Sequence, residues 1–421
     1  MNAIRKLVDD DNLMVPERFR AGHPHADWQM LRKECPVYYC EPTGYRPFWA
    51  ITKYQDIVEV EKHSDIFLNE PRFVIMPAAF EDYMNAKYGS INGLLKMMVQ
   101  MDAPDHMRYR SLLASWFQPK ALAERLKEIR AICEQFFFDL RSKGPEGEID
   151  LAQDLAFWFP LRAICALLGL PQRDDEIILR LAESAFTFKV PEPGSDATTG
   201  FEMVLSYFKA IAEERRKQPQ NDLSTYLVQA RLDGKPLEDR ELLAYFFIAA
   251  TAGHDTTSSA ITGGVKALLE NPDQLRLLQA DSSRMTGAVE EILRWVTPTI
   301  QFARTAREDY VLRGQLIRRG ETAVLYFSSG NRDDEAFPHP NEFRIERSPN
   351  RHLAFGSGPH TCVGLHLARL ELRCFLEVLF EQFEHLEIAG PTPSIASSIV
   401  TRLERLPVRY RFRDRGRYGC R

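Results

Sequence analysis

Residues 355–364 read Phe-Gly-Ser-Gly-Pro-His-Thr-Cys-Val-Gly, a glycine-rich loop that contains a single cysteine, Cys362. Apolar residues recur at helical spacing beyond the loop, which predicts that a long helix begins directly after it. The first N–H groups of a helix have no partners within the helix, so this position favours the thiolate form of the cysteine. Gly356, Gly358 and Gly364 leave room for a flat, wide group beside the backbone. For a lone cysteine, a buried structural role would be the simpler interpretation.

The spacing of the whole loop is far more specific than the cysteine alone. A thiolate in a shallow cup lined by glycine suits an axial ligand of haem iron. The string Phe-Gly-x-Gly-x-His-x-Cys-x-Gly resembles the haem-binding loop of the cytochrome P450 family, and the resemblance covers nearly the whole chain. It implies that haem b (iron protoporphyrin IX) binds with Cys362 as the metal ligand and with Phe355 and Gly356 beside it. It also implies a mainly α fold with a minor β part, in which haem lies between a long oxygen-side helix and the helix after Cys362.

The chain has 421 residues and shows no linker, low-complexity tract or repeat that would divide it. We therefore expect a single domain over residues 1–421. The helical period dominates from about 105 to 285, whereas β-like patterns occur early, at about 36–60, and late, at about 299–330 and 385–412.

Charge and cysteine usage limit the partners and the compartment. The net charge of −5 argues against binding to nucleic acid or to an anionic membrane surface. The longest apolar run, residues 242–253, is too short to span a bilayer. Seven cysteines without paired spacing fit a reducing compartment. We therefore expect a cytoplasmic monomer without nucleic-acid or membrane partners.

A second motif lies in the middle of a helix predicted over residues 237–270, where residues 252–257 read Ala-Gly-His-Asp-Thr-Thr. Glycine in a helix interior costs roughly 1 kcal/mol relative to alanine, and threonine hydroxyls can bend a helix by bonding to preceding carbonyls. A packing kink would explain these two residue types, but a lone carboxylate is costly to bury among apolar residues. The string resembles the oxygen-binding motif of the P450 family. The resemblance implies that Thr256 hydrogen-bonds oxygen at the iron, that Asp255 relays protons and that Gly253 leaves room for O2, the co-substrate.

Two basic residues one helical turn apart, His106 and Arg110, lie on one face of a predicted helix. Taken alone, they would form a solvated surface. Together with the cysteine loop they match the family's propionate-binding helix, and Arg304 and His360 match two further propionate positions. The resemblance thus implies that these four residues hold the haem carboxylates.

An i, i+3 pair of Glu291 and Arg294 is by itself a weak signal that usually marks a solvated surface. In the P450 family such a pair is buried and joined by an arginine from the segment before the cysteine loop. Arg347 is the corresponding residue here. We expect these three residues to support the fold without direct chemistry.

The substrate is less well defined by the sequence than the cofactor. We expect an apolar substrate, because few residues of the expected pocket carry a charge, although each of them could equally belong to the core. The expected pocket residues are Phe73, Met76, Met97, Met98, Phe186, Ile248, Ala249, Ala252, Ile300 and Val400. Several strings, such as Met-Asp-Ala-Pro at 101–104, resemble bacterial terpene hydroxylases of the terpineol and linalool type. Steroids, branched lipids and aromatic hydrocarbons are the alternatives.

No flavin or nicotinamide motif and no cysteine cluster for an iron–sulfur centre is evident in the sequence. We expect two electrons per turnover from a [2Fe-2S] ferredoxin with ferredoxin reductase and NAD(P)H, docked on the cysteine side near Arg108, Arg351, Arg369 and Arg373. A peroxygenase, isomerase or dehydratase is a second enzyme hypothesis, which the intact Asp255–Thr256 pair disfavours. A haem-thiolate sensor without turnover is a hypothesis of another class.

Overall fold

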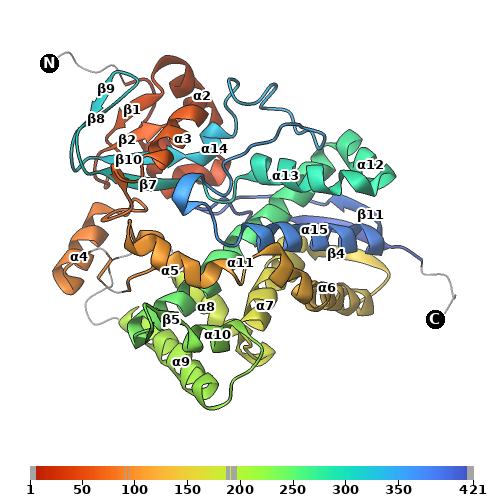
Figure 1. The fold of residues 1–421 in the computed structure, drawn as a ribbon. Coiled ribbons are helices and arrows are strands. Elements are labelled where there is room, and N and C mark those ends of the chain that lie inside the picture. Colours follow the sequence, from red (N-terminus) through yellow and green to blue (C-terminus); the bar gives the residue numbers. More distant parts are fainter. Residues whose placement is uncertain (1–5, 91, 94, 186–189, 191–196, 415–421) are drawn as a thin grey trace.

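The computed structural model describes residues 6–90, 92–93, 95–185, 190 and 197–414. Its central element is α11 (Asp239–Glu270), a helix of 32 residues that runs through the middle of the molecule (Figure 1). The helix is apolar on almost every side, and a helix of that kind is stable only when other elements cover it. Here α7 (Trp158–Leu167), α8 (Asp175–Ala185), α13 (Met285–Val296) and α15 (Leu365–Gln382) pack against it.

The remaining helices surround this centre. They are α1 (Asp11–Met14), α2 (His25–Glu34), α3 (Tyr54–Lys62), α4 (Ala78–Tyr88), α5 (Asp105–Ala114), α6 (Pro119–Ser142), α9 (Ala197–Lys217), α10 (Leu223–Gln229), α12 (Pro272–Ala280) and α14 (Phe327–Gly330). The predicted helix over 237–270 thus begins two residues later than expected.

The strands form a minor part of the molecule, and they lie in separate places: β1, β2, β7 and β10 at the upper left of Figure 1, and β4 and β11 on the opposite side, near α15. Within the residues described, one sheet has the order β1-β2-β10-β7-β3 and another the order β11-β12-β4, with two hairpins, β5-β6 and β8-β9. Their bounds are β1 (Val37–Cys40), β2 (Phe48–Ile51), β3 (Phe67–Leu68), β4 (Glu146–Asp150), β5 (Arg231–Leu232), β6 (Lys235–Pro236), β7 (Gln301–Ala306), β8 (Tyr310–Leu312), β9 (Gln315–Ile317), β10 (Thr322–Tyr326), β11 (Phe383–Ile388) and β12 (Pro407–Phe412).

The strands differ from the sequence-based expectation in several places, since β3, β4, β5 and β6 all lie outside the predicted β parts. The early β part, predicted to reach residue 60, ends before α3, because Ile57 and Val60 lie three residues apart and bury one face of a helix. The strand β4 lies inside the stretch expected to be helical, and it forms by pairing with the distant strand β12, with Ile149 opposite Val408. Pairing over such a sequence distance leaves little local signal.

The segment between β10 and α15 determines where Cys362 lies in the fold. It leaves α14, passes residues 331–354 and reaches Cys362 just before α15 begins. Because α15 packs on α11, the loop faces the middle of the central helix. None of the described helices is both long and apolar enough to cross a membrane.

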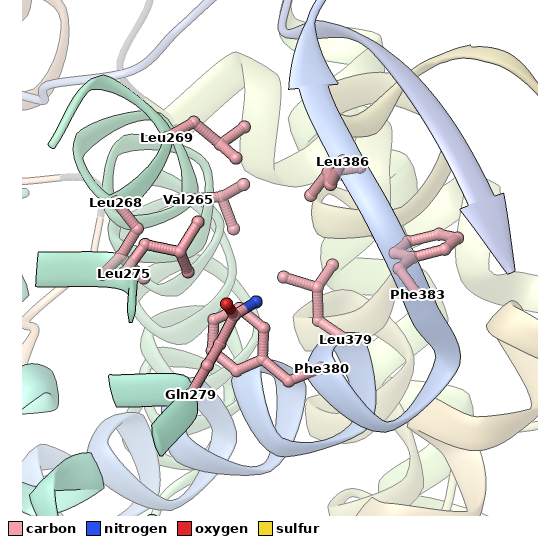
Figure 2. Close-up of a pocket in the computed structure, with 9 residues that line it drawn as sticks. All are labelled: Val265, Leu268, Leu269, Leu275, Gln279, Leu379, Phe380, Phe383 and Leu386. Carbon is pink, nitrogen blue, oxygen red and sulfur yellow. The ribbon is translucent and has the colours of Figure 1, made fainter. Parts of the chain in front are cut away.

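A small hollow of about 40 Å³ lies between α11, α12, α15 and β11 (Figure 2). Its walls are apolar apart from Gln279, and they include Leu379, near the end of α15 that is far from Cys362, and Phe383, the first residue of β11. A hollow of this size holds about one water molecule. Its lining shares no residue with the cavity that Cys362 lines.

Candidate active site

A cavity of about 250 Å³ lies between α11 and the cysteine loop. It is lined by most of the residues singled out in the sequence, and these come mainly from α5, α11, β7 and the loop before α15, with others from the segments before α4, before α5 and before β12. The predicted residues in its lining are Phe73, Met98, His106, Arg110, Ile248, Ala249, Ala252, Gly253, Asp255, Thr256, Arg304, Phe355, Gly356, His360, Cys362 and Val400.

Three of the expected pocket residues that the structure describes are not among those lining the cavity. Met76 is buried in a small cluster with Ile399, Met97 packs against the helical core, and Ile300 is buried in the core of the sheet part. Phe186 lies outside the described residues. The sequence could not distinguish Met76, Met97 and Ile300 from pocket residues, since an apolar side chain suits a core and an apolar pocket equally well.

The cysteine loop is held by its own backbone and by close packing on α3. The N–H of Cys362 donates to the carbonyl oxygen of Phe355 at 2.9 Å, which closes the loop. Gly356 and Gly358 have φ angles of 68° and 65°, which side chains rarely adopt. Cys362 exposes surface to the cavity that it lines, although the protein surrounds the residue closely enough to desolvate its thiol. The loop therefore presents one sulfur atom to the cavity from a fixed backbone.

The electrostatics of this sulfur differ in part from the expectation. Burial raises the pKa of the Cys362 thiol, while a hydrogen bond from the N–H of Gly364 and the charges of Arg110 and Arg369 lower it. The start of the helix does favour the thiolate, as expected, but desolvation outweighs it and the pKa lies above its ordinary value. Coordination to a metal ion deprotonates such a thiol.

Basic side chains gather at one end of the cavity. The rings of His106 and His360 stack with centroids 3.7 Å apart, and Arg304 and Arg110 lie beside them. Burial and the neighbouring cations lower the pKa of His360 to about 2, and burial and Arg110 lower that of His106 to about 4. Among the described residues, no carboxylate pairs with Arg110, and only Glu61 pairs with Arg304. Two arginines that share a single paired carboxylate, beside two neutral histidines that can donate hydrogen bonds, fit the two carboxylates of haem.

The lowered pKa of His106 predicts a pH dependence for the haem-free protein. Below pH 6.5, its ordinary pKa, His106 takes up a proton in the unfolded chain, but in the folded chain it does so only near pH 4. The free energy of unfolding should therefore fall as the pH drops through this window, by about 3 kcal/mol at most for His106. Urea unfolding near neutral and mildly acidic pH measures the fall.

The variant His106→Gln isolates this contribution, because His23, His25 and His360 also have lowered pKa values. We expect the variant to lose less stability on acidification than the unmodified protein. An equal loss in both proteins would show that His106 is not held neutral by its neighbours.

The middle of α11 borders the same cavity and stays helical throughout. A Cβ added at Gly253 would meet no atom within 4 Å, so its face of the helix is open. The hydroxyl of Thr256 donates to the carbonyl oxygen of Ala252 at 2.9 Å. His254 is fully buried against the carbonyl oxygen of Phe157, as a structural histidine would be.

Comparison with known proteins agrees with this geometry. The family profile described as Cytochrome P450 matches residues 195–406. A protein named cytochrome P450-terp, from Pseudomonas sp, is 34% identical over 405 residues, which are 92% of this chain and 93% of the relative. The chain belongs to the cytochrome P450 family. It is a P450 monooxygenase with the mainly helical fold and minor sheets of that family.

Two further proteins show how close the likeness is. The crystal structure of CYP108D1 from Novosphingobium aromaticivorans has a TM-score of 0.89 and 34% identity, and the match covers 97% of this chain and 99% of that one. A steroid C26-monooxygenase from Mycolicibacterium smegmatis is 32% identical over 389 residues, covering 90% of this chain and 89% of the relative. The family implies a haem-thiolate centre, and the sulfur atom and the basic cluster of this P450 suit one.

Sequence reasoning missed three charged residues of this P450 site. Asp255 is not a lone carboxylate, because Arg402, from the segment before β12, pairs with it at 2.9 Å. Glu371 on α15 is buried in the cavity wall, and burial raises its pKa well above the ordinary value despite a hydrogen bond with Thr257. Glu61 is the third. Only Glu371 left a sequence signal, as an acid among the apolar positions of α15.

The three predicted structural residues of this P450 contact one another in the interior. Glu291 and Arg294 are both fully buried and lie 2.8 Å apart, and Arg347 reaches Glu291 at 3.1 Å. Arg294 also donates to backbone carbonyls of the segment before the cysteine loop, including that of Pro340. The arrangement ties α13 to that segment, which supports the role expected from the sequence.

The arginines expected to attract a redox partner are mostly engaged within this P450. Arg108 pairs with Asp105 and Asp233, Arg369 with Glu290, and Arg373 with Glu377. Among the four, and within the described chain, only the side chain of Arg351 has no ion pair. The positive charge available to a partner at these positions is therefore smaller than expected.

Proposed function

We propose that this P450 hydroxylates a small apolar substrate of the terpenoid class with O2 and two electrons from a [2Fe-2S] ferredoxin. The observation that carries the proposal is the apolar part of the cavity, which comprises Phe73, Met98, Val99, Ile248, Ala249, Phe302, Ile399 and Val400. A wall without charged side chains favours an apolar substrate and offers no ion pair to anchor it. The likeness to P450-terp and the terpene-hydroxylase strings support the terpenoid class.

Haem is the cofactor that fits the donor set of the cavity. In this proposal Cys362 holds the iron, and His106, Arg110, Arg304 and His360 hold the carboxylates. Haem supplies the activation of O2 and the transfer of one oxygen atom to the substrate. The chain supplies binding, orientation and protons.

Proton delivery is the role of the polar residues on α11. Thr256 places a hydroxyl at the cavity wall, where it can donate a hydrogen bond once it leaves the carbonyl oxygen of Ala252. Asp255 borders the same wall, where its carboxylate can accept and donate a proton as a relay group. Arg402 holds the carboxylate of Asp255 at 2.9 Å, and the relay requires the carboxylate to leave this partner for part of each turnover.

A binding and turnover panel tests the substrate class. Monoterpenes, steroids, methyl-branched lipids and alkylbenzenes would be added to the haem-loaded protein, and the shift of its absorption spectrum measured. We expect monoterpenes to bind most tightly and to yield a hydroxylated product with ferredoxin, ferredoxin reductase and NAD(P)H. If another class of the panel binds tightly and monoterpenes do not, the result would contradict the terpenoid proposal.

A steroid hydroxylase is the second candidate, because the likeness to a steroid C26-monooxygenase extends over nine-tenths of this chain. The same panel separates the two, since a steroid that binds and turns over better than any monoterpene would favour this candidate. Turnover with peroxide alone at the rate of the full electron-transfer system would instead favour a peroxygenase. A cytoplasmic location and a monomeric state remain predictions from the sequence.

A further inference from the structure

Glu61, the penultimate residue of α3, is a buried acid in the wall of the cavity proposed to bind haem. The mechanism proposed above gives it no role. Only 2% of its side chain is exposed. Three donors converge on its carboxylate. Arg304 Nη2 lies 3.3 Å from Oε1, and the N–H and hydroxyl of Ser357 lie 2.5 Å and 2.7 Å from Oε2. A carboxyl group that only accepts hydrogen bonds in this way is arranged as an ion.

The cysteine loop holds this carboxylate in place. A Cβ at Gly358 would lie 2.6 Å from the carbonyl oxygen of Glu61, and one at Gly356 would lie 3.3 Å from its Oε1. Only glycine permits this approach, so the loop sits directly on Glu61. The acid therefore has little room to move away from the basic end of the cavity.

Arg304 would therefore interact with two anions, the carboxylate of Glu61 and a carboxylate of haem. It is the residue expected to hold a haem carboxylate, and it already carries Glu61. Its Nη1 donates to the backbone oxygen of Ala303 at 2.8 Å, which restricts the directions left for a second acceptor. A haem carboxylate beside Arg304 thus shares the guanidinium with Glu61.

We propose that Glu61 is a positioning residue that shares Arg304 with a haem carboxylate and lowers the reduction potential of haem bound in this cavity. The proposal rests on the haem-thiolate function proposed above. Reduction adds one electron to the haem, and a fixed negative charge in a poorly solvated site opposes that step. A donor of low potential, such as an iron–sulfur protein, is then required to drive it.

The variant Glu61→Gln tests the proposal, because the amide keeps the shape and still accepts from Ser357 but carries no charge. Burial raises the pKa of Glu61 above its ordinary value although Arg304 and Ser357 oppose the rise, so the measurement is made at mildly alkaline pH, which favours the ionised acid. The potential of the haem-loaded protein is measured by spectroscopic titration. We expect a rise equivalent to about tenfold more ferrous haem at a fixed potential, or about 59 mV.

Two variants serve as controls. Glu59→Gln removes a half-buried acid of the same helix that binds the hydroxyl of Tyr310 and does not line the cavity. Ser357→Ala removes a donor to Glu61 but leaves the negative charge. Both should keep the potential of the unmodified protein within a small fraction of the Glu61→Gln shift.

The outcomes are distinguishable. An unchanged potential in Glu61→Gln with an intact thiolate-type spectrum overturns this inference and leaves the proposed function standing. An equal rise in Ser357→Ala also overturns it, because Glu61 would then act by holding the loop. If Glu61→Gln fails to load haem, Glu61→Ser supplies the same comparison with a smaller neutral side chain. An unmodified protein that binds no haem through sulfur refutes the proposed function instead.

Discussion

Replacing Cys362 by serine is expected to abolish hydroxylation, with a loss of ~10³-fold or more, equivalent to about 4 kcal/mol of activation free energy. Cys362 offers the cavity its sulfur atom, and an alcohol at this position neither ionises as readily nor donates electron density to iron as sulfur does. The carbon monoxide complex of the reduced protein should lose the absorption band of thiolate ligation. Turnover with the full electron-transfer system and this spectrum are the two measurements.

Cys374→Ala provides the matched control, because Cys374 is a buried free cysteine of α15, the helix that follows Cys362, and it is not among the residues lining the cavity. This variant should keep both the spectrum and most of the turnover. If the serine variant at Cys362 retained the spectrum of the unmodified protein, another residue would be the ligand and the proposed site would be misplaced.

Replacing Thr256 by alanine is expected to uncouple electron use from hydroxylation. Its hydroxyl is the donor that α11 presents to the cavity beside Asp255, so its loss deprives the oxygen side of a positioned proton donor. We expect the fraction of electrons recovered in product to fall by ~10-fold or more, within the range that general acid–base catalysis contributes. Hydrogen peroxide should account for the missing electrons, measured against NAD(P)H consumed.

The control for Thr256 is Thr262→Ala. The Thr262 hydroxyl also donates to a carbonyl one turn earlier in α11, that of Ser258, at 2.9 Å, but Thr262 is not among the residues lining the cavity. Its variant should stay coupled even if the protein becomes less stable. Full coupling in Thr256→Ala, or equal uncoupling in both variants, would remove Thr256 from the proton pathway.

The sequence predicted those parts of the site whose residues are contiguous or share one helix. The cysteine loop is a run of ten residues, and the motif in α11 is a run of six, so their spacing is readable without a structure. His106 and Arg110 were readable because one helical turn separates them. Only the family resemblance pointed to Arg304 and His360, because no local sequence pattern connects them with His106 and Arg110.

The missed residues depend on contacts between distant segments. Arg402 is 147 residues from Asp255, and Glu61 is 243 residues from Arg304. A charged residue near the end of a short helix usually faces solvent, so nothing local distinguished Glu61. The sequence did not predict strand β4 for a related reason, because β4 forms by pairing with the distant strand β12.

Incorporation of oxygen-18 from O2 gas tests the central claim most directly. The haem-loaded protein would be supplied with ferredoxin, ferredoxin reductase, NAD(P)H, labelled O2 and the monoterpene that binds most tightly. We expect one labelled oxygen atom in the hydroxyl group of each product molecule, and no product when the ferredoxin is left out. An unlabelled product, or none with any apolar compound of the panel, would contradict the claim.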